Sequence, residues 1–192
     1  SVTIDTARGE ATVPANPERI AVYDWGMLDT LGKLGVDVGA TTTNIRLGYL
    51  QDAARNMQPV GTLFEPDYEA LHAFAPQLII TGSRTAPAFE QLSKLAPTIE
   101  MTADTTKMRE STEARIDAFA KIFHKEAEAQ ALKKEIDESF AAAKAAAQGK
   151  GSGLVILVNG GKMSAFGPDS RFGWIHRDVG VPTVDAEIKE GS

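Results

Sequence analysis

Hydrophobic side chains recur with a helical period over the longest regular stretch of the chain, residues 108–148. They stand three to five residues apart, at Ile116, Phe119, Phe123, Ala127, Leu132, Ile136, Phe140, Ala143 and Ala147. This spacing matches an α-helix, and neither Gly nor Pro interrupts it. The sequence Phe123-His124-Lys125 leaves open a break into a shorter and a longer helix. A helix from Lys125 to Gln148 would be about 36 Å long, so we interpret it as a strut between two lobes.

Short apolar runs alternate with helical patterns in the first half of the chain. The predicted strands are residues 2–4, 19–23, 36–42, 59–61, 77–81 and 97–101. The predicted helices are residues 25–34, capped by Asp24 and ended by Gly35, a helix opened by Glu65-Pro66-Asp67 and stopped by Pro76, and residues 86–95, with Phe89, Leu92 and Leu95 inward. Residues 5–17 are expected to form a loop, and residues 44–57 an irregular or helical excursion. This alternation favours a parallel sheet covered by helices.

Fewer elements follow the helical stretch. We predict a buried strand at residues 153–158, a turn at 159–161, a partner strand at 162–166, a short helix at 174–176 and a final strand pattern at 181–184. Two strands do not make a stable layer, and about 40 residues rarely bury a sufficient core. We therefore expect an incomplete second lobe, in a parent chain that continues for about 80–100 residues. The expected domains are residues 1–106, a helical connection at 107–149, and the start of the second lobe at 150–192.

Composition narrows the function classes. The 192 residues are 43% hydrophobic and 24% charged, with a net charge of −6, which disfavours a general nucleic-acid or anionic-membrane surface. No Cys is present, so disulfides and thiolate sites are excluded within these residues. No stretch reaches about 18 apolar residues, so no membrane span is expected. The absence of a leader at Ser1 fits a cytosolic protein or a mature secreted one.

Common catalytic motifs are missing from the sequence. Residues 148–153 resemble a phosphate loop but lack the GK[ST] ending and have a helix before and a strand after, which is the reverse of the required order. Neither GxSxG nor HExxH occurs. His72, His124 and His176 lie far apart on separate predicted elements. Nothing in the sequence therefore points to a nucleophile–base pair.

Five sequence blocks carry a resemblance to a known family. In order, they are NPERIAVYDWGMLDTLGKLGV, EPDYEALHAFAPQLIITGSR, LSKLAPTIE, the helical stretch, and NGGKMSAFGPDSRFGWIHRDVG. They resemble the siderophore-binding proteins of bacterial ABC iron importers, in the branch that captures ferric catecholates. That resemblance implies an α/β fold of two lobes, each with a parallel sheet flanked by helices, joined by one long helix. The ligand of that family binds between the lobes.

Two arginines match the ligand-clamping positions of the family: Arg84 in TGSRTA and Arg171 in GPDSRFG. A ferric tris-catecholate carries a charge of about −3, and guanidinium groups suit its oxygens because they stay charged and lose water readily. Arg84 follows the predicted strand at residues 77–81, and open α/β sheets bind ligands at the carboxyl ends of their strands.

Further candidates are weaker. Trp25 follows the first sheet strand, and Arg46 and Tyr49 are placed where they could line the rim of the site. Phe172 and Trp174 flank Arg171 and could stack on catecholate rings. The resemblance also aligns Glu69 with the acidic residue that docks the membrane permease. His176 falls too early to match the iron-ligating His of the family, so no metal ligand is assigned.

We therefore expect a non-enzymatic binding protein that captures a ferric siderophore as its ligand, without an intrinsic cofactor, and delivers it to an ABC transporter. It would act in the periplasm or be lipid-anchored outside the cytoplasmic membrane. The full-length form is expected to be a monomer, and domain exchange is open to the shortened chain. Two alternatives remain: a haem or cobalamin binding protein of the same fold, and an α/β enzyme or nucleotide-binding lobe.

Overall fold

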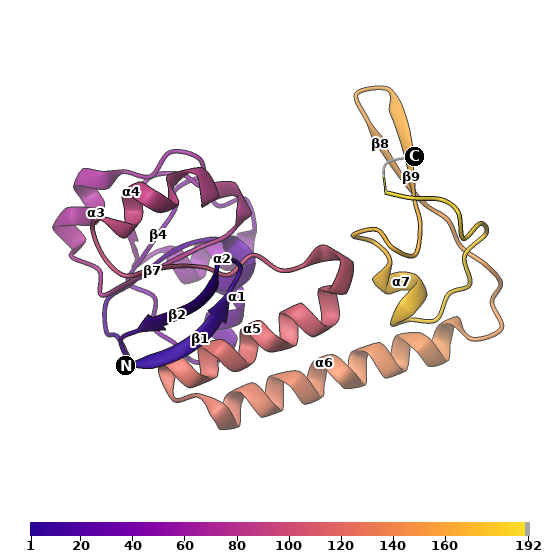
Figure 1. The fold of residues 1–192 in the computed structure, drawn as a ribbon, viewed down its shortest axis with the longest axis horizontal. Coiled ribbons are helices and arrows are strands. Elements are labelled where there is room, and N and C mark those ends of the chain that lie inside the picture. The colour runs from indigo at the N-terminus through magenta and orange to yellow at the C-terminus, as the bar shows by residue number, and fades with distance from the viewer. Residues whose placement is uncertain (191–192) are drawn as a thin grey trace. The chain divides into compact units, whose positions relative to one another are not determined.

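A computed structural model describes residues 1–190 (Figure 1). The chain divides into two compact units. Unit 1 comprises residues 1–102 and 115–130, and unit 2 comprises residues 103–114 and those from 131 onward.

Unit 1 is built on a parallel sheet of five strands in the order β5-β4-β3-β6-β7. The strands are β3 (Ile20–Tyr23), β4 (Ala40–Thr41), β5 (Gln58–Pro59), β6 (Leu78–Thr81) and β7 (Thr98–Glu100). Every residue of β3 and β6 is buried, as expected for strands covered on both faces. The predicted parallel sheet is thus confirmed, although β4 is much shorter than the predicted strand at 36–42.

Five helical segments connect these strands: α1 (Trp25–Lys33), α2 (Gly48–Ala54), α3 (Tyr68–Phe74), the 3-10 helix η1 (Ser83–Ala88) and α4 (Phe89–Ser93). The predicted cap of α1 is confirmed, because the Asp24 carboxylate accepts a hydrogen bond from the backbone N–H of Met27. Gly35, with a φ of 74°, follows the end of α1 in the left-handed conformation that glycine adopts readily.

Two helix predictions in unit 1 need correction. Pro66 does not begin α3, because Asp67 is the N-cap and Pro66 instead bridges to Gly61. Residues 86–95 do not form one helix, since the segment divides into η1 and α4. Leu95 is 37% exposed, and Ala96 occupies the core position that was expected for it.

A hairpin stands outside the parallel sheet at the N-terminus. Strands β1 (Val2–Thr6) and β2 (Gly9–Val13) pair antiparallel in a register that sets Val2 opposite Val13. The sequence predicted only the first of these strands. The prediction of a loop at residues 5–17 is therefore wrong for the residues that form β2. Ile4 and Val13 bury their side chains, which anchors the hairpin to unit 1.

The long helical stretch is two helices, as the alternative with a break predicted. A 3-10 turn η2 (Thr105–Lys107) leads into α5 (Met108–Phe123), and α6 (Glu126–Ala147) follows after His124, whose φ is 55°. The 22 residues of α6 span about 33 Å. Ile116, Phe119 and Phe123 are buried as predicted, whereas Ala127 is exposed and Ala129 is buried.

Unit 2 contains the hairpin of β8 (Val155–Asn159) and β9 (Lys162–Phe166), followed by α7 (Trp174–Arg177). The predicted pairing and turn are confirmed, but β8 is not a buried strand. Ile156 is 50% exposed and Val158 is 64% exposed. Within the described residues, the predicted strand at 181–184 is reduced to a single bridge from Thr183 to Gly153.

Candidate ligand-binding site

The carboxyl edge of the parallel sheet gathers polar and aromatic side chains within unit 1. Trp25 is the second residue after β3, Thr42 follows β4 directly, and Arg84 is the third residue after β6. All these strands run parallel, so their carboxyl ends meet at one edge, where open α/β sheets bind ligands.

Arg84 is exposed, and within residues 1–190 its guanidinium makes no hydrogen bond or ion pair. The segment that carries it is nonetheless held firmly. The buried Thr85 hydroxyl donates a hydrogen bond of 2.6 Å to the carbonyl of Leu63 and lies 3.4 Å from that of Tyr23. A cationic group with no protein partner on an anchored segment is available to an anionic ligand.

Trp25 links the ends of two strands. Its indole Nε1 donates a hydrogen bond of 3.0 Å to the Thr42 hydroxyl, and the side chain is half-buried. Arg46 is exposed and Tyr49 is 62% exposed, in the segment that follows β4. These three predicted residues therefore belong to unit 1 together with Arg84.

Gly82 brings the segment after β6 against the end of β3. A Cβ atom at this position would collide with the carboxylate of Asp24, the residue that caps α1. Glycine is required here for close approach and not for a left-handed φ.

Arg115 of α5 is a partly buried cation that sequence reasoning missed. Its Nη1 donates to the carbonyl of Met101, just after β7, at 3.3 Å, and its Nε is buried without a hydrogen-bond partner among residues 1–190. Burial lowers the pKa of Arg115, and the nearby Asp24 carboxylate opposes that shift. Its position four residues before Phe119 on the buried face of the helix was the available signal.

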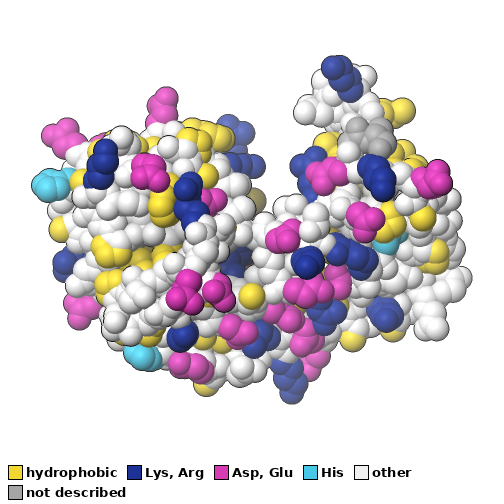
Figure 2. Space-filling model, in the orientation of Figure 1, with side chains coloured by type: hydrophobic (Ala, Val, Ile, Leu, Met, Phe, Trp, Pro, Cys, Tyr) yellow, Lys and Arg dark blue, Asp and Glu magenta, His cyan; other side chains and the backbone are white. Residues whose placement is uncertain are grey.

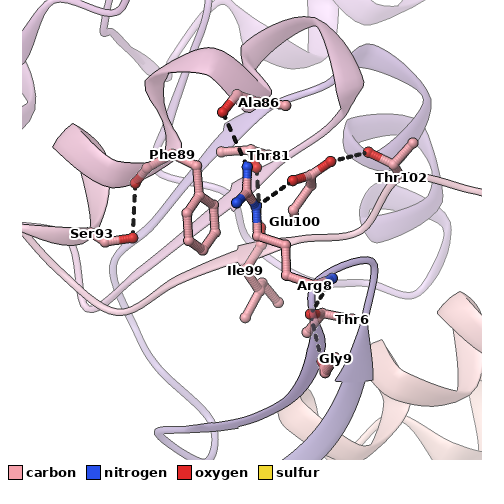
Figure 3. A network of polar contacts seen from close by, with 10 residues as sticks. All are labelled: Thr6, Arg8, Gly9, Thr81, Ala86, Phe89, Ser93, Ile99, Glu100 and Thr102. Carbon is pink, nitrogen blue, oxygen red and sulfur yellow. Dashed lines mark hydrogen bonds and ion pairs between the residues drawn. The ribbon is translucent and has the colours of Figure 1, made fainter.

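Sequence reasoning also missed two residues of unit 1 that lie at or near the candidate site, Arg8 and Phe64. Arg8, at the tip of the β1–β2 hairpin, pairs with Glu100 at the end of β7 (Figure 3). Phe64 is 71% exposed and adjoins Leu63, whose carbonyl accepts the hydrogen bond from Thr85. A single exposed aromatic residue in a turn carries no distinctive sequence signal.

Arg171 lies in unit 2 and is already partnered. Its Nε lies 3.2 Å from a carboxylate oxygen of Glu190, and its guanidinium lies over the rings of Phe166 and Phe172, at 5.0 and 5.3 Å from their centroids. The two rings meet edge to face with centroids 4.9 Å apart. Buried Ser170 stiffens the loop, because its hydroxyl donates to the carbonyl of Gly167 at 2.7 Å.

Trp174 and His176 make contacts within unit 2. Trp174 packs edge to face on Phe140 of α6, with ring centroids 6.2 Å apart. The Nδ1 of His176 lies 2.7 Å from the carbonyl oxygen of Val181, and its Nε2 is buried without a hydrogen-bond partner in the described residues. Residues 1–190 contain no cluster of three or more acidic or His side chains that could hold a metal ion.

Glu69 is exposed in the first turn of α3. On the face that Figure 2 shows, acidic and basic side chains are interspersed along α5 and α6. None of the helices among residues 1–190 combines the length and the hydrophobicity needed to cross a bilayer.

These features fit a known class of protein: the chain belongs to the periplasmic binding protein family, whose model matches residues 20–192. It is 40% identical over 181 residues to the petrobactin-binding protein YclQ of Bacillus subtilis, an alignment that covers 92% of this chain and 57% of YclQ. The chain thus spans less than two thirds of the length of that curated relative.

Solved structures agree with this assignment. The crystal structure of YclQ from Bacillus subtilis matches with a TM-score of 0.91 and 38% identity, covering 100% of this chain and 69% of that one. The periplasmic catecholate-siderophore binding protein VctP of Vibrio cholerae matches with a TM-score of 0.87 and 29% identity, covering 100% of this chain and 72% of that one. The resemblance inferred from the sequence is therefore confirmed.

Proposed function

We propose that the protein binds a ferric siderophore of the catecholate type and delivers it to an ABC importer. Membership of the periplasmic binding protein family supports this proposal, as do the ligand classes in the names of YclQ and VctP. The observation that carries it is the exposed guanidinium of Arg84 at the carboxyl edge of the sheet, which has no hydrogen-bond or ion-pair partner in the described part of the chain.

The chemistry of the ligand suits this residue. A ferric tris-catecholate presents six oxygen atoms and a charge of about −3, and hydrogen bonds between charged groups are roughly twice as strong as neutral ones. A guanidinium offers several N–H donors in a fixed plane and remains charged when water is removed. Arg84 can donate to these oxygens without first leaving a protein partner.

Arg171 is proposed as the second ligand-binding arginine. Unlike Arg84, it is ion-paired before the ligand binds. It must exchange Glu190 for the ligand, since its Nε already lies 3.2 Å from that carboxylate. Side-chain exposures of 45% for Arg171 and 43% for Glu190 make this a solvated ion pair of low strength, which a multiply charged ligand can replace. Phe166 and Phe172 would hold the guanidinium plane during the exchange.

The remaining site residues follow from the same proposal. Trp25, Arg46, Tyr49, Phe172 and Trp174 are proposed as further ligand contacts. Glu69, exposed on α3, would pair with an arginine of the transporter permease. The protein would work outside the cytoplasmic membrane, in the periplasm or on a lipid anchor, and it would make or break no covalent bond.

A fluorescence titration tests the proposal directly. Trp25 and Trp174, the two tryptophans of the chain, report on ligands at either unit. Ferric tris-catecholate, a neutral ferric hydroxamate and haem are added separately. Saturable quenching is expected, with the tightest binding for the catecholate complex. Tighter binding of haem would favour the haem alternative, and no saturable response to the catecholate complex would contradict the proposal.

A further inference from the structure

Arg8 makes contacts with three separate elements at the carboxyl edge of unit 1 (Figure 3). Its Nε lies 2.6 Å from Oε2 of Glu100, and its Nη2 donates to the carbonyl of Ala86 at 3.3 Å. The guanidinium also lies over the ring of Phe89, 4.0 Å from the centroid. One side chain from the N-terminal hairpin thus joins β7, η1 and the start of α4.

Glu100 depends on this arrangement because it is buried, with only 9% of its surface exposed. Its second carboxylate oxygen accepts a hydrogen bond of 3.0 Å from the Thr102 hydroxyl, and its backbone carbonyl accepts one of 2.9 Å from the N–H of Ala7. A buried carboxylate needs a partner of opposite charge, and Arg8 supplies it.

The contacts to Ala86 and Phe89 bear on the segment that carries Arg84. Ala86 lies two residues after Arg84 within η1, and Phe89 opens the helix that follows. Arg84 itself has no protein partner in residues 1–190, so its position depends on how firmly η1 is held. The Thr85 hydroxyl holds η1 toward Leu63, and Arg8 holds it toward Glu100.

We propose that Arg8 is a positioning residue for ligand binding: it locks η1 against Glu100, so that the Arg84 guanidinium is presented to the ligand in one orientation. This inference rests on the proposed siderophore-binding function. An ordered segment binds more tightly because less conformational entropy is lost when the ligand arrives.

A simpler explanation would be that Arg8 attracts the anionic ligand through its charge alone. Two variants separate these explanations. Arg8→Lys keeps the charge but loses the planar fork that reaches both Glu100 and Ala86. Glu100→Gln keeps the shape of the side chain but adds one positive unit to the net charge, so attraction by charge predicts tighter binding and the lock predicts weaker binding.

Binding of ferric tris-catecholate is measured by tryptophan quenching for the wild type, Arg8→Lys, Glu100→Gln and the control Arg55→Lys. Arg55 is an exposed arginine of unit 1 that pairs only with Asp52 among the described residues. The lock predicts that both Arg8→Lys and Glu100→Gln raise the Kd by about 3- to 10-fold, whereas Arg55→Lys changes it by less than about twofold. Tighter binding by Glu100→Gln, or wild-type affinity in Arg8→Lys, would overturn the proposal.

Hydrogen exchange of the ligand-free protein gives a second readout that does not depend on the siderophore. If Arg8 locks η1 against Glu100, the amides of residues 83–86, 88 and 89 should exchange faster in Arg8→Lys and Glu100→Gln, while the amides of β3 stay protected in every variant. Unchanged exchange in residues 83–89 would overturn the lock. If the wild type fails to bind the catecholate complex, the proposed function fails, and the exchange result still decides whether Arg8 orders η1.

Discussion

Replacing Arg84 with Ala is the most direct test of how the ligand is recognised. The guanidinium is exposed and has no protein partner within residues 1–190, so its removal strands no buried group. Surface substitutions of this kind change the free energy of unfolding by no more than about 0.5 kcal/mol. Any larger loss of ligand affinity can then be attributed to binding and not to folding.

The expected loss follows from the strength of one hydrogen bond to a charged group. Such a bond contributes about 1.5–3 kcal/mol, and every 1.4 kcal/mol is about a factor of ten in Kd. Arg84→Ala should therefore raise the Kd for ferric tris-catecholate by about 10- to 100-fold. The Kd of Arg84→Lys should lie between those of the wild type and Arg84→Ala, because an ammonium keeps the charge without the bidentate geometry.

Tryptophan quenching provides the assay, with the ferric tris-catecholate and the neutral ferric hydroxamate titrated in parallel. The matched control is Arg55→Ala, which removes the same charge from unit 1 where Asp52 already pairs with it at 2.7 Å. This control should change the Kd by less than about twofold.

Three results would refute the reasoning. Equal losses for Arg84→Ala and Arg55→Ala would mean that total charge matters and position does not. Equal losses for the charged and the neutral complex would mean that Arg84 does not recognise ligand charge. An unchanged Kd for Arg84→Ala would mean that this residue does not contact the ligand.

Other substitutions test the framework of unit 1 and its edge. Tyr23→Phe removes a buried hydroxyl that donates to the carbonyl of Val60 at 2.8 Å, so unfolding by denaturant should show a loss of about 1 kcal/mol. Burial raises the pKa of Tyr23 above its ordinary value of 10.0, so the stabilisation is present below pH 10 and declines as the pH rises toward the higher folded-state pKa. Gly82→Ala should cost about 1–3 kcal/mol in thermal unfolding, because the new methyl group displaces the Asp24 carboxylate. Phe64→Ala should leave stability nearly unchanged, since the side chain is 71% exposed. It should weaken the binding of an aromatic ligand by about 0.5–1.5 kcal/mol in the quenching assay.

Each of these three substitutions has a control variant or a result that would contradict the prediction. Above pH 10 the stability of the wild type should decline more steeply with pH than that of Tyr23→Phe, which lacks the ionisable hydroxyl. The same decline in both proteins would contradict the raised pKa of Tyr23. Gly48→Ala is the control for Gly82, since its Cβ would meet nothing within 4 Å and should not destabilise. Weakened binding of the non-aromatic hydroxamate complex by Phe64→Ala would argue against ring stacking.

Several elements could be predicted because their determinants are local. The apolar runs at Ile20–Tyr23 and Leu78–Thr81 are long enough to mark buried strands, and all their residues are buried. The α1 helix begins and ends with local signals, the Asp24 side chain and the left-handed Gly35. The break at His124 was also left open as an alternative, at the sequence Phe123-His124-Lys125.

The errors share a different cause. The β2 strand is stabilised by pairing with β1, and the short sequence Gly9–Val13 carries no local signal for this pairing. Leu95 is exposed and Ala96 is buried, because α4 ends at Ser93 and both residues lie beyond the helix that was expected to continue to Leu95. The apolar run at β8 looks buried by composition, although it is largely exposed in unit 2.

The sequence by itself determined the α/β class, the parallel sheet of unit 1 and the caps of α1, because hydrophobic period and turn residues act within a few residues of one another. It also determined the family, through the order of motifs along the chain. It also singled out Arg84 through a motif. Only the tertiary structure could reveal what holds that residue, since Arg8 and Glu100 stand 92 residues apart. Contacts over such separations depend on how hairpin, sheet and helix pack together, and no local pattern records them.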